Sequence, residues 1–116
     1  MSVELKDVWN VEIKTSFDVN SIFYEKKVLI IIKNHSPYIR KFEIGTKYIN
    51  IEDQYEALKF RMHYNLISPV VISIDKYRKE IIEVLIPKIN HHLGDDIIFY
   101  VKNLDKNEEK EIQYNL

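Results

Sequence analysis

The densest group of potential metal ligands in this sequence is a short run of imidazole and carboxylate side chains. His91 and His92 are followed by Gly94, Asp95 and Asp96. Such groups can bind zinc or calcium, and a glycine turn can bring them together. Adjacent residues of a strand point apart, however, and no spacing of the His-x-x-x-His kind occurs. We therefore expect no metal or other cofactor, but a polar turn in which Asp95 or Asp96 bonds to local backbone amides.

No other combination of residues is typical of a catalytic centre. His35 and His63 stand alone, and the chain has no cysteine and no Gly-x-Ser-x-Gly motif. The two glycines lie 49 positions apart, so they cannot form one phosphate-binding loop. The carboxylates are scattered, without an apolar pair suited to acid/base work. We expect no catalytic residues and no enzyme activity. Asn34-His35-Ser36 is formally a glycosylation sequon, but Pro37 follows it and we interpret it as incidental.

Residues 24–48 combine basic and aromatic side chains, although the whole chain has a net charge of only −1. Six Lys or Arg residues oppose two glutamates, a local net charge of +4. The candidate nucleic-acid surface comprises Lys26, Lys27, Tyr38, Arg40 and Lys41. Cations with stacking aromatics are typical of such surfaces. Lysines also protect strand edges, and tyrosines are common in strands. A nucleic-acid-binding β-barrel is therefore an alternative and not the preferred interpretation.

Hydrophobic alternation is the dominant pattern that could position these groups. From Trp9 to Val19, apolar or β-favouring residues alternate with polar ones, as in a half-buried strand. Short apolar runs bounded by turn residues predict further strands. Residues 39–44 end at Gly45-Thr46, which we interpret as a turn before 47–51. The remaining predicted strands are 28–33, 70–74, 81–86, 97–102 and 110–114.

The segment from residue 51 to residue 67 fits two structures. Leu58, Phe60, Met62, Tyr64 and Leu66 alternate with polar residues, which predicts a strand over 57–67 with His63 facing solvent. A helix would instead place Ile51, Tyr55, Leu58, Met62 and Leu66 on one face, after an Asn50 cap. The strand leaves fewer apolar residues unexplained, and we favour it, with one helical turn before it as an option.

Together these elements predict an all-β, antiparallel immunoglobulin-like β-sandwich of about eight strands, forming one domain over residues 1–116. A single alanine in 116 residues argues against a helical protein. The longest apolar run has five residues, whereas a membrane-spanning helix needs about twenty, so we expect no membrane insertion and a cytoplasmic location. The abundance of Ile, Lys, Asn and Tyr also fits an AT-rich genome, such as that of a thermophilic archaeon or a virus.

Two stretches carry a family resemblance. Residues 28–36 form an apolar strand ending in Lys-Asn-His-Ser, and Ile86-Pro87-Lys88-Ile89 leads through Gly94 to the alternating residues 97–101. This resembles the immunoglobulin-like sandwiches of prokaryotic adhesion and accessory modules, of the CARDB and NEW3 type. The resemblance covers about a third of the chain, and the insertion His91-His92 departs from it. It implies a fold and a role in binding, scaffolding or assembly, without transferable catalytic residues.

The preferred function is a non-catalytic protein-protein interaction or assembly module. Eight tyrosines, one tryptophan and many isoleucines exceed what a small core needs, and such residues are common at interfaces. The runs 28–32 and 70–74 carry no charge, which predicts strands covered on both faces, by a second sheet or by a partner. We expect a protein partner or self-association through strand edges or apolar faces. A small viral or host-defence inhibitor is a further alternative.

Overall fold

The protein, described here from a computed structural model over residues 8–116, is an all-β sandwich with one short helix. This confirms the expected all-β antiparallel sandwich. The described residues hold seven strands rather than the eight or nine predicted. The elements are β1 (Trp9–Ser16), β2 (Tyr24–Asn34), β3 (Arg40–Asn50), α1 (Gln54–His63), β4 (Val70–Ile74), β5 (Lys79–Pro87), β6 (Asp96–Asn103) and β7 (Glu108–Asn115).

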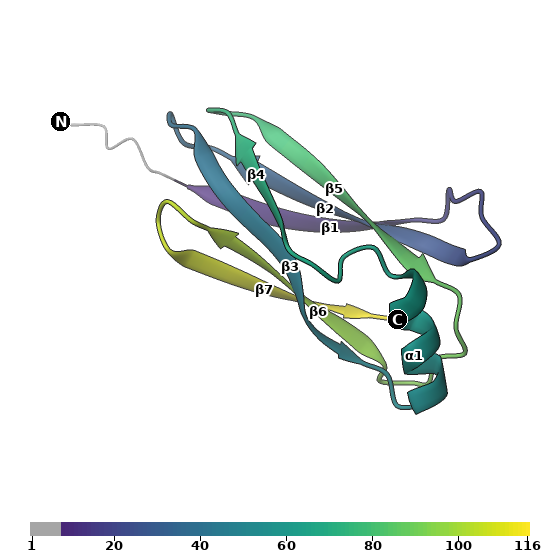
Figure 1. Ribbon diagram of the computed structural model, residues 1–116. Helices are drawn as coiled ribbons and strands as arrows, with labels where there is room; N and C mark the ends of the chain where they lie inside the picture. The colour runs from purple at the N-terminus through teal and green to yellow at the C-terminus, as the bar shows by residue number, and fades with distance from the viewer. Residues whose placement is uncertain (1–7) are drawn as a thin grey trace.

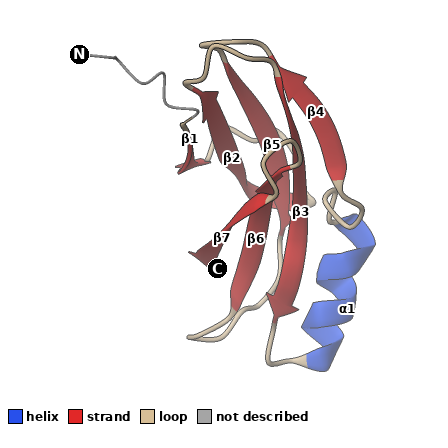
Figure 2. Ribbon diagram, turned by 90° about the vertical axis from the view of Figure 1, so that its left-hand side faces the viewer, coloured by secondary structure: helices blue, strands red, loops and turns tan. Residues whose placement is uncertain are grey.

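The strands form two antiparallel sheets that face each other (Figure 1). The first sheet has the order β1-β2-β5, and the second has the order β4-β3-β6-β7. The turns after β2 and β4 lie at one end of the sandwich, which we call the loop end. Helix α1 lies at the opposite end, the helix end, beside the lower part of β3 (Figures 1 and 2).

Alternation along the strands accounts for the core between the sheets. In β2, the side chains of Val28, Ile30 and Ile32 are fully buried and face the second sheet. Their counterparts on the second sheet include Phe42, Ile44, Phe99 and Val101, also fully buried. Ile31 faces outward yet is only 6% exposed, because β2 is the central strand of its sheet. The second sheet thus covers one face of residues 28–32, as predicted, whereas on the outer face Ile31 is buried and Leu29 is partly exposed.

Two predicted strand boundaries are wrong. The first strand ends at Ser16 rather than Val19, and Phe17 is exposed. Gly45 is not in a turn but inside β3, which continues to Asn50 with a shift in its pairing to β6 between Thr46 and Tyr48. The aromatic ring of Tyr100 on β6 lies over Gly45, so a Cβ atom at Gly45 would be 2.5 Å from Tyr100 Cε1. The glycine thus makes room for a neighbouring ring, a use of glycine in strands that resembles a turn signal in the sequence.

The strand predicted over residues 57–67 is also wrong, because residues 54–63 form helix α1. Asp53, rather than Asn50, caps it: its carboxylate accepts hydrogen bonds from the backbone N–H groups of Tyr55 (2.9 Å) and Glu56 (3.1 Å). Glu56 in the first turn and Arg61 in the last complement the helix dipole. These local signals stabilise a helix over a segment whose apolar residues also alternate.

The buried face of α1 differs from both faces considered for this segment. Phe60 is fully buried, whereas Leu58 and Met62, inward in both interpretations, are 66% and 77% exposed. Contacts beyond the helix select this face. The buried carboxylate of Glu56 accepts a hydrogen bond from the backbone N–H of Asn90 (3.1 Å). The hydroxyl of Tyr64 lies 2.6 Å from Thr46 Oγ1 on β3.

Candidate interaction surfaces

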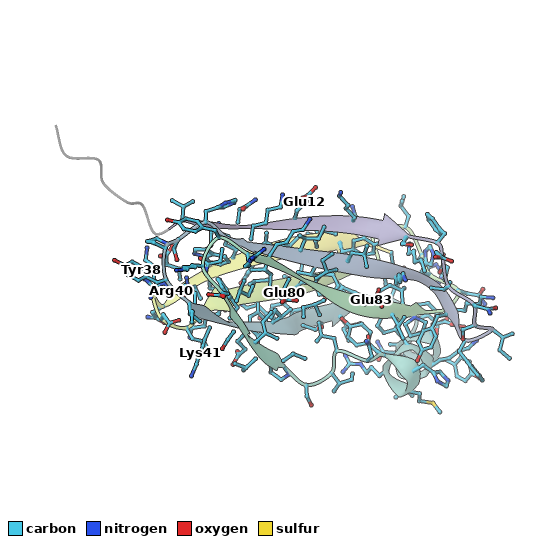
Figure 3. All side chains as sticks on the ribbon, turned by 90° about the horizontal axis from the view of Figure 1, so that it is seen from above. Glu12, Tyr38, Arg40, Lys41, Glu80 and Glu83 are labelled. Atoms are coloured by element: carbon cyan, nitrogen blue, oxygen red, sulfur yellow. The ribbon has the colours of Figure 1, made fainter. Side chains whose placement is uncertain are left out.

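The structure divides the predicted nucleic-acid surface into two parts. Lys26 and Lys27 lie near the start of β2, and Tyr38, Arg40 and Lys41 follow its end, so about 23 Å of strand separates the groups. Lys27 forms an ion pair with Glu83 (3.4 Å), and Lys26 Nζ lies 5.4 Å from the ring centre of Tyr114. Figure 3 shows Glu83 well away from the labelled loop-end residues. The five side chains therefore form no continuous surface.

Tyr38, Arg40 and Lys41 do lie together at the loop end (Figure 3). The guanidinium of Arg40 stands 4.9 Å from the ring centre of Tyr38, a cation–π contact. Tyr38 is 55% exposed. The backbone N–H of Lys41 donates to the carboxylate of Asp105 (2.7 Å), which holds the start of β3 against the β6–β7 turn. This part of the predicted set is an exposed aromatic and basic corner.

The side chain of Asn34 ties the two turns of the loop end together. Its Nδ2 donates to the carbonyl groups of Tyr38 (2.8 Å), Ile74 (3.1 Å) and Asp75 (3.2 Å), and its Oδ1 accepts from the N–H of Ser36 (3.0 Å). Asn34 is only 1% exposed. An amide nitrogen engaged in this way is not accessible to a glycosyl donor. This placement supports the interpretation of the sequon as incidental.

A cavity of about 410 Å³ opens beside Asn34. Its lining consists of Lys33, Asn34, His35, Tyr77, Arg78 and Lys79. Tyr77, Arg78 and Lys79 lie between the predicted strands 70–74 and 81–86, and they are not among the candidate residues predicted from the sequence. The available signal was a repeated pattern: Tyr77-Arg78-Lys79 resembles Tyr38-Ile39-Arg40-Lys41, a tyrosine followed by arginine and lysine.

The histidine and aspartate run forms a hydrogen-bonded turn. The buried carboxylate of Asp95 accepts from the backbone N–H groups of His92 (2.8 Å) and Glu52 (3.0 Å), which confirms the expected amide bonding. Burial alone would raise the pKa of the Asp95 carboxyl group. The two hydrogen bonds and the nearby histidines outweigh this effect, so the pKa lies below its ordinary value. Within residues 8–116, no three potential metal-ligating side chains are grouped as a metal site would require.

The two isolated histidines, His35 and His63, each contact one uncharged side chain. The ring of His35 lies 2.7 Å from the side-chain oxygen of Asn10. His63, predicted to face solvent from a strand, instead lies in the last turn of α1 and stacks on Phe23 at 5.2 Å between ring centres. His63 is not solvated as predicted, because the last turn of α1 places its ring against Phe23 in the β1–β2 loop.

A polar network crosses the outer face of the second sheet. The hydroxyl of Tyr100 donates to Glu43 on β3 (2.8 Å), while Lys47 contacts Glu111 and Glu109 on β7. Burial and the hydrogen bond to the Glu43 carboxylate raise the pKa of Tyr100 to about 12. Charged and hydroxyl groups thus occupy the middle of this face, leaving it poorly suited to an apolar partner.

Strand β4 offers a different kind of surface, the edge of the second sheet. It pairs only with β3, and its residues Val70-Val71-Ile72-Ser73-Ile74 include no charged side chain. Val71 is 57% exposed, so the described part of the chain does not cover the outer face of this strand, and cover of that face by a partner stays a prediction. The sequence pattern could not distinguish a central strand from an uncharged edge. Pairing with β3 alone is what leaves one face and one edge open.

The other three edge strands of the described residues carry charges. β1 has Glu12 and Lys14, β5 begins with Lys79 and Glu80, and β7 begins with two glutamates and a lysine. Asn65 also covers part of the β5 edge, because its side chain bonds to both Leu85 N (2.9 Å) and Glu83 O (3.2 Å). Charged side chains and covering groups discourage strand addition at an edge. Only β4 lacks charged side chains among these four edges.

Comparisons with known proteins add no family to these observations. No protein-family model, curated protein or solved structure matches the chain. In the part of the chain that the structure describes, no helix is both long and apolar enough to cross a membrane. The candidate surfaces therefore have to be interpreted from their own geometry.

Proposed function

We propose that this protein is a non-catalytic interaction module that binds its partner by strand addition at β4. The observation that carries the proposal is the absence of charge from an open edge strand in a protein whose other edges are charged. A partner strand that pairs with β4 would satisfy the backbone groups on its open side. Strand addition of this kind requires an extended segment in the partner and no binding pocket in this protein.

The partner that best fits this edge is a second copy of β4. In an antiparallel pair centred on Ile72, each Val71 would face Ser73 of the other copy, and each Val70 would face Ile74. No like charges meet in this register, and β-branched residues on opposing strands stabilise a sheet. Pairing would join two four-stranded sheets into one. Ile67 (54% exposed) lies three residues before β4 in the sequence and would extend the apolar contact. Ile39 (63% exposed) comes just before Arg40, the residue of β3 that pairs with Ile74 at the other end of β4.

The oligomeric state of wild-type protein and one charged variant tests this proposal. Ser73 is exposed and follows the central residue Ile72, so Ser73→Lys places two lysines near the centre of the paired strands. We expect sedimentation equilibrium to show a concentration-dependent dimer for wild type and a monomer for Ser73→Lys. Circular dichroism should show the same folded sheet content for both.

The matched control is Asn115→Lys, which adds the same charge to an exposed position on β7, at the other edge of the sheet. It should dimerise like wild type. A wild-type protein that stays monomeric up to its solubility limit would overturn pairing with a second copy. Dimerisation that Ser73→Lys leaves intact would show that β4 is not the interface.

We also propose that the sandwich belongs to the immunoglobulin-like group. Support comes from the strand order: in constant-type immunoglobulin domains the first, second, fifth and fourth strands form one sheet and the third, sixth and seventh form the other. Here the fourth strand pairs with the third instead, while the other six strands keep that arrangement. β4 therefore belongs to the second sheet instead of the first, and it forms the edge strand proposed as the interface.

A further inference from the structure

The cavity at the loop end is built from segments that backbone hydrogen bonds hold in place. The N–H of Asn34 donates to Arg78 O (2.9 Å), and the N–H of Tyr77 donates to Ser36 O (3.2 Å). The amide of Asn34 adds bonds to the carbonyls of Ile74 and Asp75. The two turns are thus fixed relative to each other. A volume of about 410 Å³ falls within the range of small-molecule sites, roughly 300–1,000 Å³.

The charges around this cavity are unbalanced. Lys33, Arg78 and Lys79 line it, and no carboxylate does. Lys33 also lies directly opposite Lys79 in the β2–β5 register, an arrangement that destabilises a sheet. Lys33 has one ion-pair partner, Glu12 at 3.5 Å. Within residues 8–116, the side chains of Arg78 and Lys79 have no such partner. An anion in the cavity would offset this repulsion.

Tyr77 supplies an exposed aromatic ring beside these cations. It is 62% exposed and has a φ of +56°, a left-handed conformation that is unfavourable for an aromatic residue. The N–H of Arg78 bonds to Asp75 O (3.1 Å), so Tyr77 occupies the third position of a tight turn. Glycine or asparagine is the usual residue at such a position. The stability of the fold alone therefore does not explain a tyrosine here.

We propose that this cavity binds a nucleotide, with its phosphate near Arg78 and Lys79 and its base stacked on Tyr77. Arginine and lysine are the usual partners of phosphate, and a tyrosine face stacks on any base. The ligand is either a free nucleotide or one unit of a single strand, since both present the same phosphate and base. The turn that carries Tyr77 directly follows β4, and three of the six lining residues belong to the basic segment 24–48. The proposed ligand contacts come from the side chains of Tyr77, Arg78 and Lys79, which lie outside both that segment and β4.

Fluorescence anisotropy tests the proposal with two probes, fluorescein-labelled AMP and a labelled single-stranded oligothymidylate. We expect at least one probe to bind, with an affinity that falls as salt rises. Arg78→Glu and Lys79→Glu should each weaken binding at least tenfold. Lys59→Glu changes the charge equally on the exposed face of α1 and should leave binding unchanged. Binding of the labelled AMP identifies a free nucleotide as the ligand, and binding of the oligonucleotide alone identifies a single strand.

Tyr77→Asn separates a binding role from a structural one. Asparagine tolerates a positive φ better than tyrosine, so the variant should be at least as stable as wild type in thermal unfolding. It should nevertheless bind the nucleotide at least tenfold more weakly, because the stacking surface is lost. Failure of both probes to bind would overturn the proposal. So would equal affinity in wild type, Arg78→Glu and Lys79→Glu, or inorganic phosphate competing as well as unlabelled nucleotide.

Discussion

In the second sheet, Gly45 leaves room for the aromatic ring of Tyr100 on the neighbouring strand. The two residues are directly opposite in the β3–β6 register, and the ring occupies the space that a side chain at Gly45 would fill. This position brings the phenol to Glu43, 2.8 Å away. A glycine in a strand weakens it through backbone entropy. Here the cost is offset by a packed ring and a hydrogen bond to a carboxylate.

Tyr100 should therefore make the stability of the protein sensitive to high pH. Its pKa is raised to about 12 from an ordinary value of 10.0, because burial and the Glu43 carboxylate both disfavour the phenolate. A raised pKa in the folded state stabilises the protein below pH 10, and this contribution is lost as the pH rises toward 12. We expect the difference in unfolding free energy between wild type and Tyr100→Phe to shrink across this interval in urea titrations. A difference that stays constant would contradict the prediction.

At the scale of the element, α1 shows which contacts decide between helix and strand. Phe60 is fully buried and its ring centre lies 4.9 Å from that of Tyr64, whereas Leu58 faces solvent. We expect Phe60→Ala to lower the unfolding free energy by about 3–5 kcal/mol, as for large aromatic residues in cores. Leu58→Ala, the matched control on the opposite face, should change it by less than about 0.5 kcal/mol. Equal losses in chemical denaturation would mean that another face of the segment is buried.

The elements also show how far the sequence could predict the fold and the candidate sites. The strands at residues 28–33 and 97–102 were predictable because a short apolar run bounded by turn residues is a local pattern. Residues 54–63 were not, since their buried face depends on contacts with Thr46 and Asn90. The lack of charge in β4 was visible in the sequence, but its edge position was not. The cavity could not be predicted either, because only the strand register brings Lys33 beside Lys79.

At the scale of the whole molecule, Trp9 joins the two sheets near the loop end. It begins β1, yet its ring centre lies 5.3 Å from that of Phe42 on β3, and the Lys110 ammonium on β7 stands 4.3 Å from its indole ring. The same ammonium donates to Trp9 O (2.7 Å). Trp9 is only 4% exposed and is the one tryptophan of the chain. Its fluorescence should therefore report separation of the sheets.

We expect the two ends of the sandwich to unfold together. One cluster of buried residues runs from Trp9 through both sheets to Phe60 in α1, and domains of this size with one core usually unfold in a single transition. Urea unfolding followed by Trp9 fluorescence and by far-ultraviolet circular dichroism should give the same midpoint. A tryptophan moved to the buried face of α1, in Trp9→Phe with Phe60→Trp, provides the second position, because Phe60 is fully buried. The urea midpoint from the fluorescence of this tryptophan should equal the midpoint from the circular dichroism of the same variant. If the helix-end signal changed at lower urea than the circular dichroism, α1 would unfold separately, and the contacts of Glu56 and Tyr64 would not couple it to the sheets.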